Sequence, residues 1–535
     1  MPTHEVLNQP PPLEVNLFAV DAPLQEAATR GGAEWAKAQL LELGQWAGSR
    51  AAQTWAAQAN ENPPRLRTHD RYGNRIDEVE FHPAWHELMR VAVAHGVHSL
   101  AWEEDREGAH VARAALMFLD SQCEQGHGCP ISMTYSAVPA LRRQPDLARE
   151  WERRAVSREY DARFVPAAQK RGALIGMAMT EKQGGSDVRA NTTRAVRDGD
   201  AWRLSGHKWF CSAPMSDAFL VLAQAGKGLS CFLVPRWTPD EQRNRFFLQR
   251  LKDKLGNRSN ASAEIELDGA WGQLVGEEGR GVPAILEMVN HTRLDCVLGS
   301  AAVMRQALWQ AAHHCSHRRA FGKLLVDHPA MRNVLADLCI EAEAALLLAM
   351  RLARAYDAPE ESAFRRIATA ISKYWICKRA PAAVGEALEC LGGNGYVEES
   401  GMPRLYREAP LNSIWEGSGN VICLDVLRAL GKEPAASEAL LAELRAARGT
   451  DRRLDAHLDA TEAMLGGATE ADARRLPEAL AVALQGALLV RHSAPAVADA
   501  FCASRLAGDW GRTLGTLPRA VDIAALVARA QPGAR

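Results

Sequence analysis

The spacing of apolar residues divides the chain into a helical region, a strand-rich region and a second helical region. In the first region, apolar residues recur at helical spacing within 34–47, and further helices are predicted at 87–101 and 109–119. An Asn- and Pro-bearing loop at 60–64 interrupts this pattern. We therefore expect an N-terminal helical domain over residues 1–174.

Short β-rich runs replace the helical pattern in the middle of the chain. Asp-Gly, Ser-Gly and Lys-Gly turns separate these runs, as in a series of antiparallel strands. The runs lie at 173–178, 201–204, 218–223, 230–234 and 263–267. The sequence therefore predicts a compact antiparallel β domain over residues 175–282.

Long helices are predicted again beyond this region. Pro329 stands near the start of one, and its apolar face keeps helical spacing as far as Tyr356. We expect a helical bundle at 283–432, a break at the Gly-Lys-Glu-Pro segment, and an extra Ala/Leu-rich helical domain at 435–535. The predicted fold class is thus α+β and multidomain, with a β domain between helical domains.

Composition narrows the class of protein. The 535 residues are 47% hydrophobic and 24% charged, which is ordinary for a soluble globular protein. A net charge of −2 gives no global reason to expect nucleic acid. Eleven cysteines without tight clustering favour reduced thiols and a cytoplasmic location. We expect no signal segment and no membrane span.

Paired glycines follow the first predicted strand, in the segment 179–187. Gly184 and Gly185 allow a tight turn and a close approach of the backbone to a flat ligand. Thr180 and Ser186 place hydroxyl groups on either side. A Gly-Gly turn between strands is also a common structural feature, so both interpretations stay open on these residues alone.

A second candidate is the acidic loop at 414–420, just before a predicted helix at 421–430. Ser418 or Asn420 is expected to cap that helix. Glu416 is either an acid near the positive end of the helix dipole or a partly desolvated base. The residues alone favour the capping loop.

Other common sites are not supported by the sequence. His313 and His317 share a helical face with His314 beside them, but no acidic residue or second ligand pair accompanies them, so we predict no metal. The glycines at 276–281 lack the spacing of a dinucleotide-binding fingerprint. A Rossmann fold is therefore not expected.

Several segments together resemble the acyl-CoA dehydrogenase superfamily. They occur in the family's order, across the β domain and the bundle, and are highly specific as a set. The segments are MTEKQGGSD, HKWFCS, GEEGRG, RRAFGKLL, LGGNGY and WEGSGN.

Further strings are similar to the alkylation-response, AidB-like branch of that superfamily. They extend into the N-terminal region, and the extra C-terminal helical domain is also a feature of the branch. The strings include LNQPPPL, FHPAWHELM, CPISMT, LKDKLGNRSNAS, PRLYREAPLNSIWEGSGN and CLDVLR.

The resemblance implies a non-covalently bound FAD and an acyl-CoA thioester as substrate. Glu416 matches the catalytic base, which removes the α-proton while the flavin takes a hydride from the β-carbon. The alternative position for this base holds Thr292, before Arg293. The residues that match cofactor-binding positions are Met177, Met179, Thr180, Gly184, Gly185, Ser186, Phe210, Cys211, Ser212, Arg318, Ile414, Trp415, Gly417, Ser418, Gly419, Asn420 and Leu424.

The resemblance also implies partners. Arg318 matches an arginine that reaches the FAD of a neighbouring subunit, so a homotetramer is expected. One departure is Glu389, which stands where many dehydrogenases carry a glutamine near the adenosine phosphates. An acid there is unfavourable unless its side chain turns away.

The branch is regarded as a group of poor dehydrogenases that bind double-stranded DNA. Beyond Pro434 twelve arginines balance twelve acidic residues, so a DNA site must be a local patch. Arg428 matches an arginine assigned to DNA in the branch, although an ordinary solvated helix face explains it equally well. We therefore expect a DNA-binding flavoprotein with weak, isovaleryl-CoA-like dehydrogenase activity. The alternatives are a metabolic dehydrogenase of short or branched acyl-CoA, or a flavin-bearing scaffold without substrate.

Overall fold

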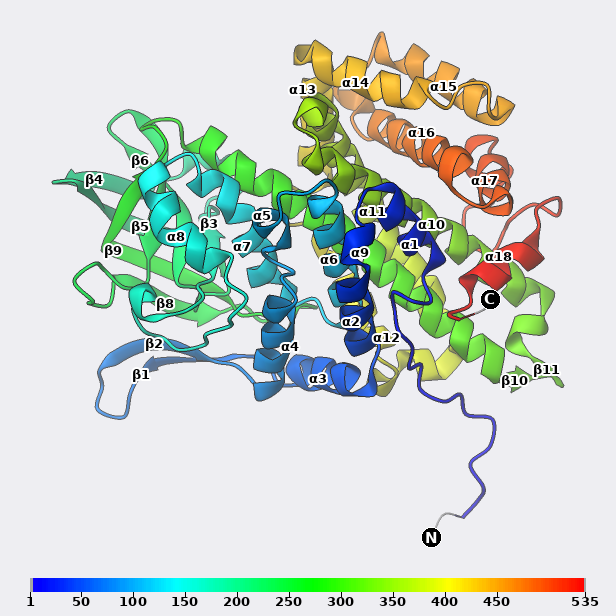
Figure 1. The fold of residues 1–535 in the computed structure, drawn as a ribbon, viewed down its shortest axis with the longest axis horizontal. Coiled ribbons are helices and arrows are strands. Elements are labelled where there is room, and N and C mark those ends of the chain that lie inside the picture. The colour runs from blue at the N-terminus through cyan, green and yellow to red at the C-terminus, as the bar shows by residue number, and fades with distance from the viewer. Residues whose placement is uncertain (1–2, 534–535) are drawn as a thin grey trace. The chain divides into compact units, whose positions relative to one another are not determined.

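The structure is a computed structural model that describes residues 3–533 (Figure 1). Its internal contacts divide the chain into two compact units. Unit 1 consists of Met1–Ala51, His110–Cys123 and Cys296–Arg535, and unit 2 consists of Ala52–Ala109 and Glu124–Asp295. The long helix α9, Gly281–His317, supplies residues to both units.

Unit 2 is built on a seven-stranded sheet with helices packed against it. The sheet strands are β3 Ile175–Ala178, β4 Arg194–Asp198, β5 Ala201–Ser212, β6 Ala218–Ala225, β7 Gly228–Pro235, β8 Phe246–Leu251 and β9 Ser262–Val275. The remaining elements are α3 Arg50–Glu61, β1 Arg65–His69, β2 Arg75–Glu80, α4 Pro83–Ala94, α5 Leu100–Glu103, α7 Gly128–Leu141 and α8 Pro145–Ala155.

The sheet of unit 2 closes on itself. Its strand order is β3-β6-β4-β5-β9-β7, and β7 also pairs with β6. Most pairs are antiparallel, as predicted, but β3 and β4 each run parallel to β6. Closure leaves few unpaired backbone groups at sheet edges and gives the loops that follow β3 and β5 a rigid support.

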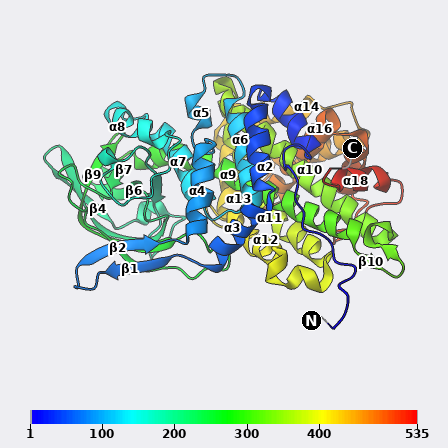
Figure 2. The ribbon, with the colours of Figure 1, turned by 60° about the horizontal axis from the view of Figure 1, so that its bottom comes forward.

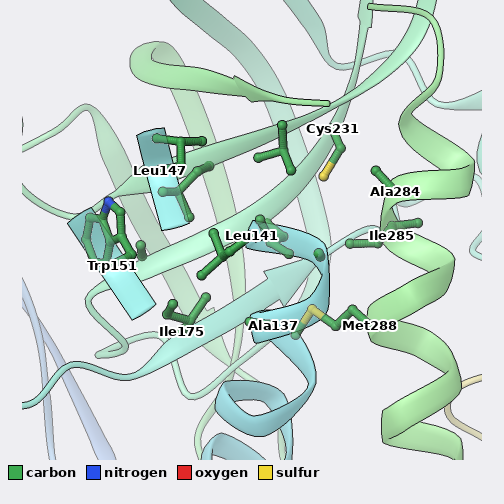
Figure 3. Packing of buried hydrophobic residues seen from close by; sticks show 14 of the residues in the cluster. Ala137, Leu141, Leu147, Trp151, Ile175, Cys231, Ala284, Ile285 and Met288 are labelled. Carbon is green, nitrogen blue, oxygen red and sulfur yellow. The ribbon is translucent and has the colours of Figure 1, made fainter. Parts of the chain in front are cut away.

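Strand β6 lies between the two hydrophobic clusters that form the core of unit 2. Its first six residues, AFLVLA, are all apolar and buried because both faces of the strand are covered there. Leu220 and its alternate neighbours pack against α7, α8 and the first turns of α9, as Figure 3 shows for the same cluster. Phe219 and Val221 face the opposite way, into the second cluster of the sheet.

Two predictions for the N-terminal region are wrong in detail. The helix expected at 87–101 is in fact two helices, because α4 starts at Pro83 and ends at Ala94, and Gly96 then adopts a left-handed conformation (φ 65°). The helical prediction also omitted the β1–β2 hairpin. Strand β1 alternates between exposed and partly buried positions, and the middle of β2 alternates between partly buried and buried ones, which is the period-two pattern of a strand.

Unit 1 is helical in its described residues, apart from a small hairpin, β10 Arg319–Ala320 with β11 Lys323–Leu324. Its helices are α1 Ala22–Arg30, α2 Lys37–Ala47, α6 Ala109–Cys123, α10 Pro329–Asp357, α11 Ser362–Glu389, α12 Met402–Glu408, α13 Gly419–Lys432, α14 Pro434–Arg445, α15 Arg452–Leu465, α16 Arg475–His492, α17 Pro495–Phe501 and α18 Ile523–Ala530.

Helices α10 and α11 form the centre of unit 1 and lie side by side (Figure 2). The bundle helix predicted from Pro329 onward is confirmed as α10, whose inward positions are almost all buried. Helices α13, α14 and α16 pack against α11, while α16 and α18 also contact α10. No helix among residues 3–533 is long and apolar enough to cross a membrane.

Candidate functional site

The segment with paired glycines follows β3 directly, and we call residues 179–187 the glycine loop. Gly185 lies so close to Thr180 that a Cβ there would fall 2.6 Å from the threonine Oγ1. Gly184 has φ 152°, and a Cβ there would meet nothing within 4 Å. Gly184, Gly185 and Ser186 are exposed. The loop thus presents open backbone beside hydroxyl groups, which fits the polar edge of a flat ring.

A buried ion pair, which the predictions did not single out, holds the glycine loop. Lys208 Nζ lies 2.8 Å from Glu181 Oε1, and neither side chain is exposed. Lys208 also donates to the carbonyl of Leu222 at 2.7 Å. The carboxylate of Glu181 further accepts hydrogen bonds from Gln183 Nε2, the Thr192 amide and hydroxyl, and the Thr193 amide.

The hydrogen bonds around Glu181 decide its charge. Burial alone would raise the pKa of Glu181, but donors from Lys208, Thr193 and Thr192 hold this pKa far below its usual range. Burial lowers the pKa of Lys208 to about 8, although Glu181 opposes that shift. A fixed carboxylate in the loop therefore determines the path of the backbone next to the glycines.

The end of β5 lies beside the glycine loop. The Trp209 amide donates to the Thr180 carbonyl at 2.8 Å. Phe210 is 49% exposed, whereas Cys211 is buried in the core of the sheet, where burial raises the pKa of its thiol to about 12. Ser212 is half-buried. Along this strand, Phe210 and Ser212 are thus available to a ligand, but Cys211 offers only its backbone.

Trp209 is covered by a cation. Lys252 Nζ lies 3.1 Å from the centroid of the indole ring, and Arg250 also approaches the ring. Both basic side chains are held by Glu264, each at 2.6 Å. Met177 and Met179 are half-buried and pack against the core cluster. Of the predicted residues in unit 2, all therefore lie on β3, the glycine loop or the end of β5.

The acidic loop, residues 414–420, lies in unit 1 directly after the short 3-10 helix Leu411–Ser413, and its last two residues begin α13, which starts earlier than predicted. Glu416 has a left-handed backbone, φ 58°, which is unfavourable for a residue with a side chain. Gly417 follows with φ 106°. Glycine would adopt the conformation of Glu416 at lower cost, so the backbone at this residue is strained.

Contacts from the bundle fix the acidic loop. The buried Lys373 donates from Nζ to the Gly417 carbonyl. Trp415 Nε1 donates to Asn412 Oδ1 at 2.8 Å, and Asn412 donates in turn to Ser300 Oγ at 3.2 Å. Lys373 was missed by sequence reasoning, although a lysine at a core-facing position of a helix is a signal that it has a buried partner.

The expected caps of α13 differ in the structure. Ser418 occupies the position before the helix, but its side chain makes no capping hydrogen bond. Asn420 instead accepts a hydrogen bond from Arg474 Nε at 2.8 Å. Ile414 is 63% exposed, Gly419 is buried, and Leu424 is half-buried.

Arg318 and the histidines lie at the end of α9. Arg318 Nη1 donates to the Asn8 carbonyl at 2.6 Å. His313 Nε2 lies 2.8 Å from the Pro11 carbonyl, and His317 Nδ1 lies 2.8 Å from the His313 carbonyl. Among residues 3–533 no three His, Cys, Asp or Glu side chains are arranged to hold a metal ion.

Comparisons with known proteins cover nearly the whole chain. Residues 8–162 match the N-terminal domain of the adaptive response protein AidB. Residues 176–270 and 279–431 match the middle and C-terminal domains of acyl-CoA dehydrogenases. The chain is 48% identical over 507 residues to the putative acyl-CoA dehydrogenase AidB of Escherichia coli, and the match covers 94% of each protein.

Solved structures support the same assignment. Caenorhabditis elegans ACDH-11 in complex with C11-CoA is 30% identical with a TM-score of 0.86, over 95% of this chain and 94% of that one. A glutaryl-CoA dehydrogenase from Mycobacterium smegmatis in complex with FADH2 shares the fold, with 22% identity and a TM-score of 0.61 over 77% of this chain and 99% of that one. The chain therefore belongs to the acyl-CoA dehydrogenase family, whose cofactor is FAD, and within it to the AidB-like group.

Proposed function

We propose that this protein is a cytoplasmic FAD-dependent acyl-CoA dehydrogenase of low activity that binds double-stranded DNA in the response to DNA alkylation. The observation that carries the proposal is the extent of the likeness to AidB, which includes the N-terminal region and the helices beyond Pro434. A likeness confined to the flavin-binding core would favour an ordinary metabolic dehydrogenase instead.

The glycine loop and the end of β5 are proposed to hold the FAD. Exposed backbone at Gly184 and Gly185, with the hydroxyls of Thr180 and Ser186, offers hydrogen-bonding groups to a flat polar ring. The fixed path of this loop supports the assignment, because the buried pair of Glu181 and Lys208 holds it before any ligand arrives. Bound FAD supplies the two-electron acceptor of the reaction.

Glu416 is proposed as the base that removes the α-proton of the acyl thioester. The left-handed backbone at this residue supports the role, since strain of this kind persists where the side chain is needed. Lys373 donates to the carbonyl of Gly417, so its role is to position the acidic loop, and it does not itself take part in the proton transfer. The C11-CoA bound to the C. elegans relative supports an acyl-CoA substrate.

Arg428 is proposed to contact DNA phosphate. Its side chain is 63% exposed and lies 3.7 Å from Asp425, which is held more closely by Arg366 at 2.8 Å. Arg445 and Arg448 are also solvent-accessible but are paired with Glu462. A phosphate can therefore engage Arg428 without breaking a short ion pair.

An oligomer, expected to be a tetramer, is also part of the proposal. Phe321 is 97% exposed at the tip of the β10–β11 hairpin and has a left-handed backbone, φ 50°. An exposed aromatic ring beside Arg318 supports a contact with a second subunit. Light scattering coupled to gel filtration measures the mass, and a monomer at micromolar concentration would contradict this part.

The proposal is tested by anaerobic titration of the flavin absorbance with isovaleryl-CoA, with and without duplex DNA. We expect slow bleaching and duplex binding that weakens steeply with salt and falls in Arg428→Ala. Arg452→Ala, another exposed arginine, is the matched control. Rapid bleaching without duplex binding would favour the metabolic dehydrogenase, and salt-independent binding would exclude a phosphate-based site.

A further inference from the structure

A cavity of about 290 Å³ lies within unit 1, between α1, α10, α14 and α16. Four arginines from three different helices line it, namely Arg30, Arg351, Arg354 and Arg491. Glu361 and Glu443 are its only acidic lining residues in the described chain. The cavity shares no residue with the glycine loop or the acidic loop.

Both acidic residues of the cavity form ion pairs with Arg351. Arg351 donates to Glu361 at 2.6 Å and, through both ends of its fork, to Glu443 at 2.8 and 3.2 Å. Arg491 reaches only the already shared Glu443, at 3.2 Å. Arg351 is thus paired with both carboxylates, in keeping with its low exposure, and Glu443 is shared with Arg491.

Arg30 and Arg491 add further positive charge to the cavity lining. Burial lowers the pKa of Arg30, and the nearby Arg491 adds to this effect while Glu26 opposes it. Glu26 itself lies 3.4 Å from Arg529. The pKa of His492 falls to about 4 because of burial and the charges of Arg30 and Arg491, so this imidazole is neutral at pH 7. Positive charge is therefore concentrated here beyond what the carboxylates balance.

Another part of the cavity lining is apolar. Leu347 and Met350 of α10 and Leu488 of α16 form it. The volume lies near the lower end of the range for small-molecule sites, and exceeds the needs of a single inorganic anion. An occupant would thus combine an anionic group near the arginines with an apolar body in contact with these three side chains.

We propose that this cavity binds a small organic phosphate monoester, with its phosphate held by Arg30 and Arg491 and its apolar body against Leu347, Met350 and Leu488. Arginine forks match phosphate oxygens in a bidentate manner. A monoester carries close to two negative charges at pH 7, which suits an excess of arginines better than a singly charged carboxylate does. The site is independent of the proposed dehydrogenase and DNA-binding functions.

Phenyl phosphate is a suitable probe, titrated calorimetrically into the FAD-loaded protein. We expect binding that weakens about tenfold or more in Arg30→Gln and in Arg491→Gln, since each loses a charged hydrogen-bonding pair. Arg452→Gln, which changes an exposed arginine outside the cavity, should bind as the wild type does. Retention of the flavin spectrum shows that each variant is folded. Arg491→Lys should bind phenyl phosphate with intermediate affinity, because lysine keeps the positive charge but lacks the guanidinium fork.

Three results would overturn the proposal. Phenyl phosphate that does not bind at millimolar concentration would exclude the site. If inorganic phosphate binds as tightly as phenyl phosphate, Leu347, Met350 and Leu488 do not contribute to the affinity. Equal weakening of duplex DNA binding in Arg30→Gln and Arg491→Gln would assign these arginines to a nucleic-acid surface instead of a small-molecule cavity.

Discussion

Lys208 Nζ lies 2.8 Å from Glu181 Oε1, and both side chains are completely removed from solvent. Glu181 belongs to the glycine loop and Lys208 to β5, so the pair links the interior of the sheet to the backbone proposed to hold FAD. Breaking a buried pair on one side leaves an uncompensated charge, which typically costs about 3–5 kcal/mol. The stability of unit 2 and the affinity for FAD are therefore expected to depend on the same two residues.

Glu181→Gln tests this dependence. We expect a lower thermal midpoint and release of FAD, because Lys208 is left without its buried carboxylate and the loop loses an ionic acceptor. The double variant Glu181→Gln/Lys208→Met should recover much of the lost thermal stability without recovering FAD affinity. The midpoint is followed by circular dichroism, and bound FAD by absorbance after gel filtration.

Asp198→Asn is the matched control for this experiment. Asp198 pairs with Arg203 at 2.7 Å, but both side chains are about half exposed. An exposed pair contributes at most about 1 kcal/mol. An equal loss of FAD from Asp198→Asn and Glu181→Gln would show that the buried pair has no special role.

Gly185→Ala should weaken FAD binding. The added Cβ would meet Thr180 Oγ1 at 2.6 Å, so the threonine or the loop must shift. We expect a loss of affinity of about tenfold, corresponding to about 1.4 kcal/mol, measured by fluorescence quenching of added FAD. Gly467→Ala is the control, since a Cβ there meets nothing within 4 Å and the protein should bind FAD normally.

Glu416→Gln should abolish bleaching of the flavin by acyl-CoA while leaving FAD bound. The substitution removes the proposed base but keeps the size of the side chain and the hydrogen bond from Lys373 to Gly417. Stopped-flow absorbance measures the effect, with the exposed Glu399→Gln as control. Bleaching of the variant at the wild-type rate would exclude Glu416 as the base.

Acid should destabilise unit 2 through Glu124. Burial alone would raise the pKa of Glu124, but hydrogen bonds from His127 and Ser259 lower it to about 2, against an ordinary value of 4.5. The Glu124 carboxylate therefore binds a proton more tightly in the unfolded chain than in the folded one. Its ionised form thus stabilises the fold fully above pH 4.5, and this stabilisation is lost as the pH falls toward 2. It amounts to about 3 kcal/mol.

The comparison of Glu124→Gln with the wild type isolates this contribution. The difference between their thermal midpoints should be largest near pH 6 and shrink as the pH falls from 4.5 toward 2, because the wild type loses its advantage there. A difference that stays constant over this range would show that Glu124 does not carry a depressed pKa.

The sequence predicts the long elements of the fold because their patterns are local. The face of α10 from Pro329 repeats over many turns, and the apolar run of β6 reflects burial on both faces. The β1–β2 hairpin was not predicted because its strands are rich in charged residues. It is stabilised by contacts distant in sequence, such as the hydrogen bond from Arg75 to the Leu248 carbonyl. The bounds of the predicted domains remain predictions.

In the candidate site, too, some residues could be predicted from local motifs and others depend on tertiary contacts. Paired glycines near Thr180 and the acid at Glu416 are visible as local motifs, so their chemistry could be predicted. Lys208 and Lys373 could not be assigned from spacing, because their partners lie 27 and 44 residues away in sequence. Which carbonyl or carboxylate a buried lysine meets depends on the tertiary packing, which no local pattern contains.

The binding of FAD to the glycine loop is tested most directly by reconstitution. The purified protein, supplied with excess FAD and desalted, should retain stoichiometric flavin with a visible absorption spectrum, and Gly185→Ala should retain much less under the same conditions. Wild-type protein that is folded yet colourless after this treatment, or a Gly185→Ala variant that holds FAD as tightly as the wild type, would contradict the account.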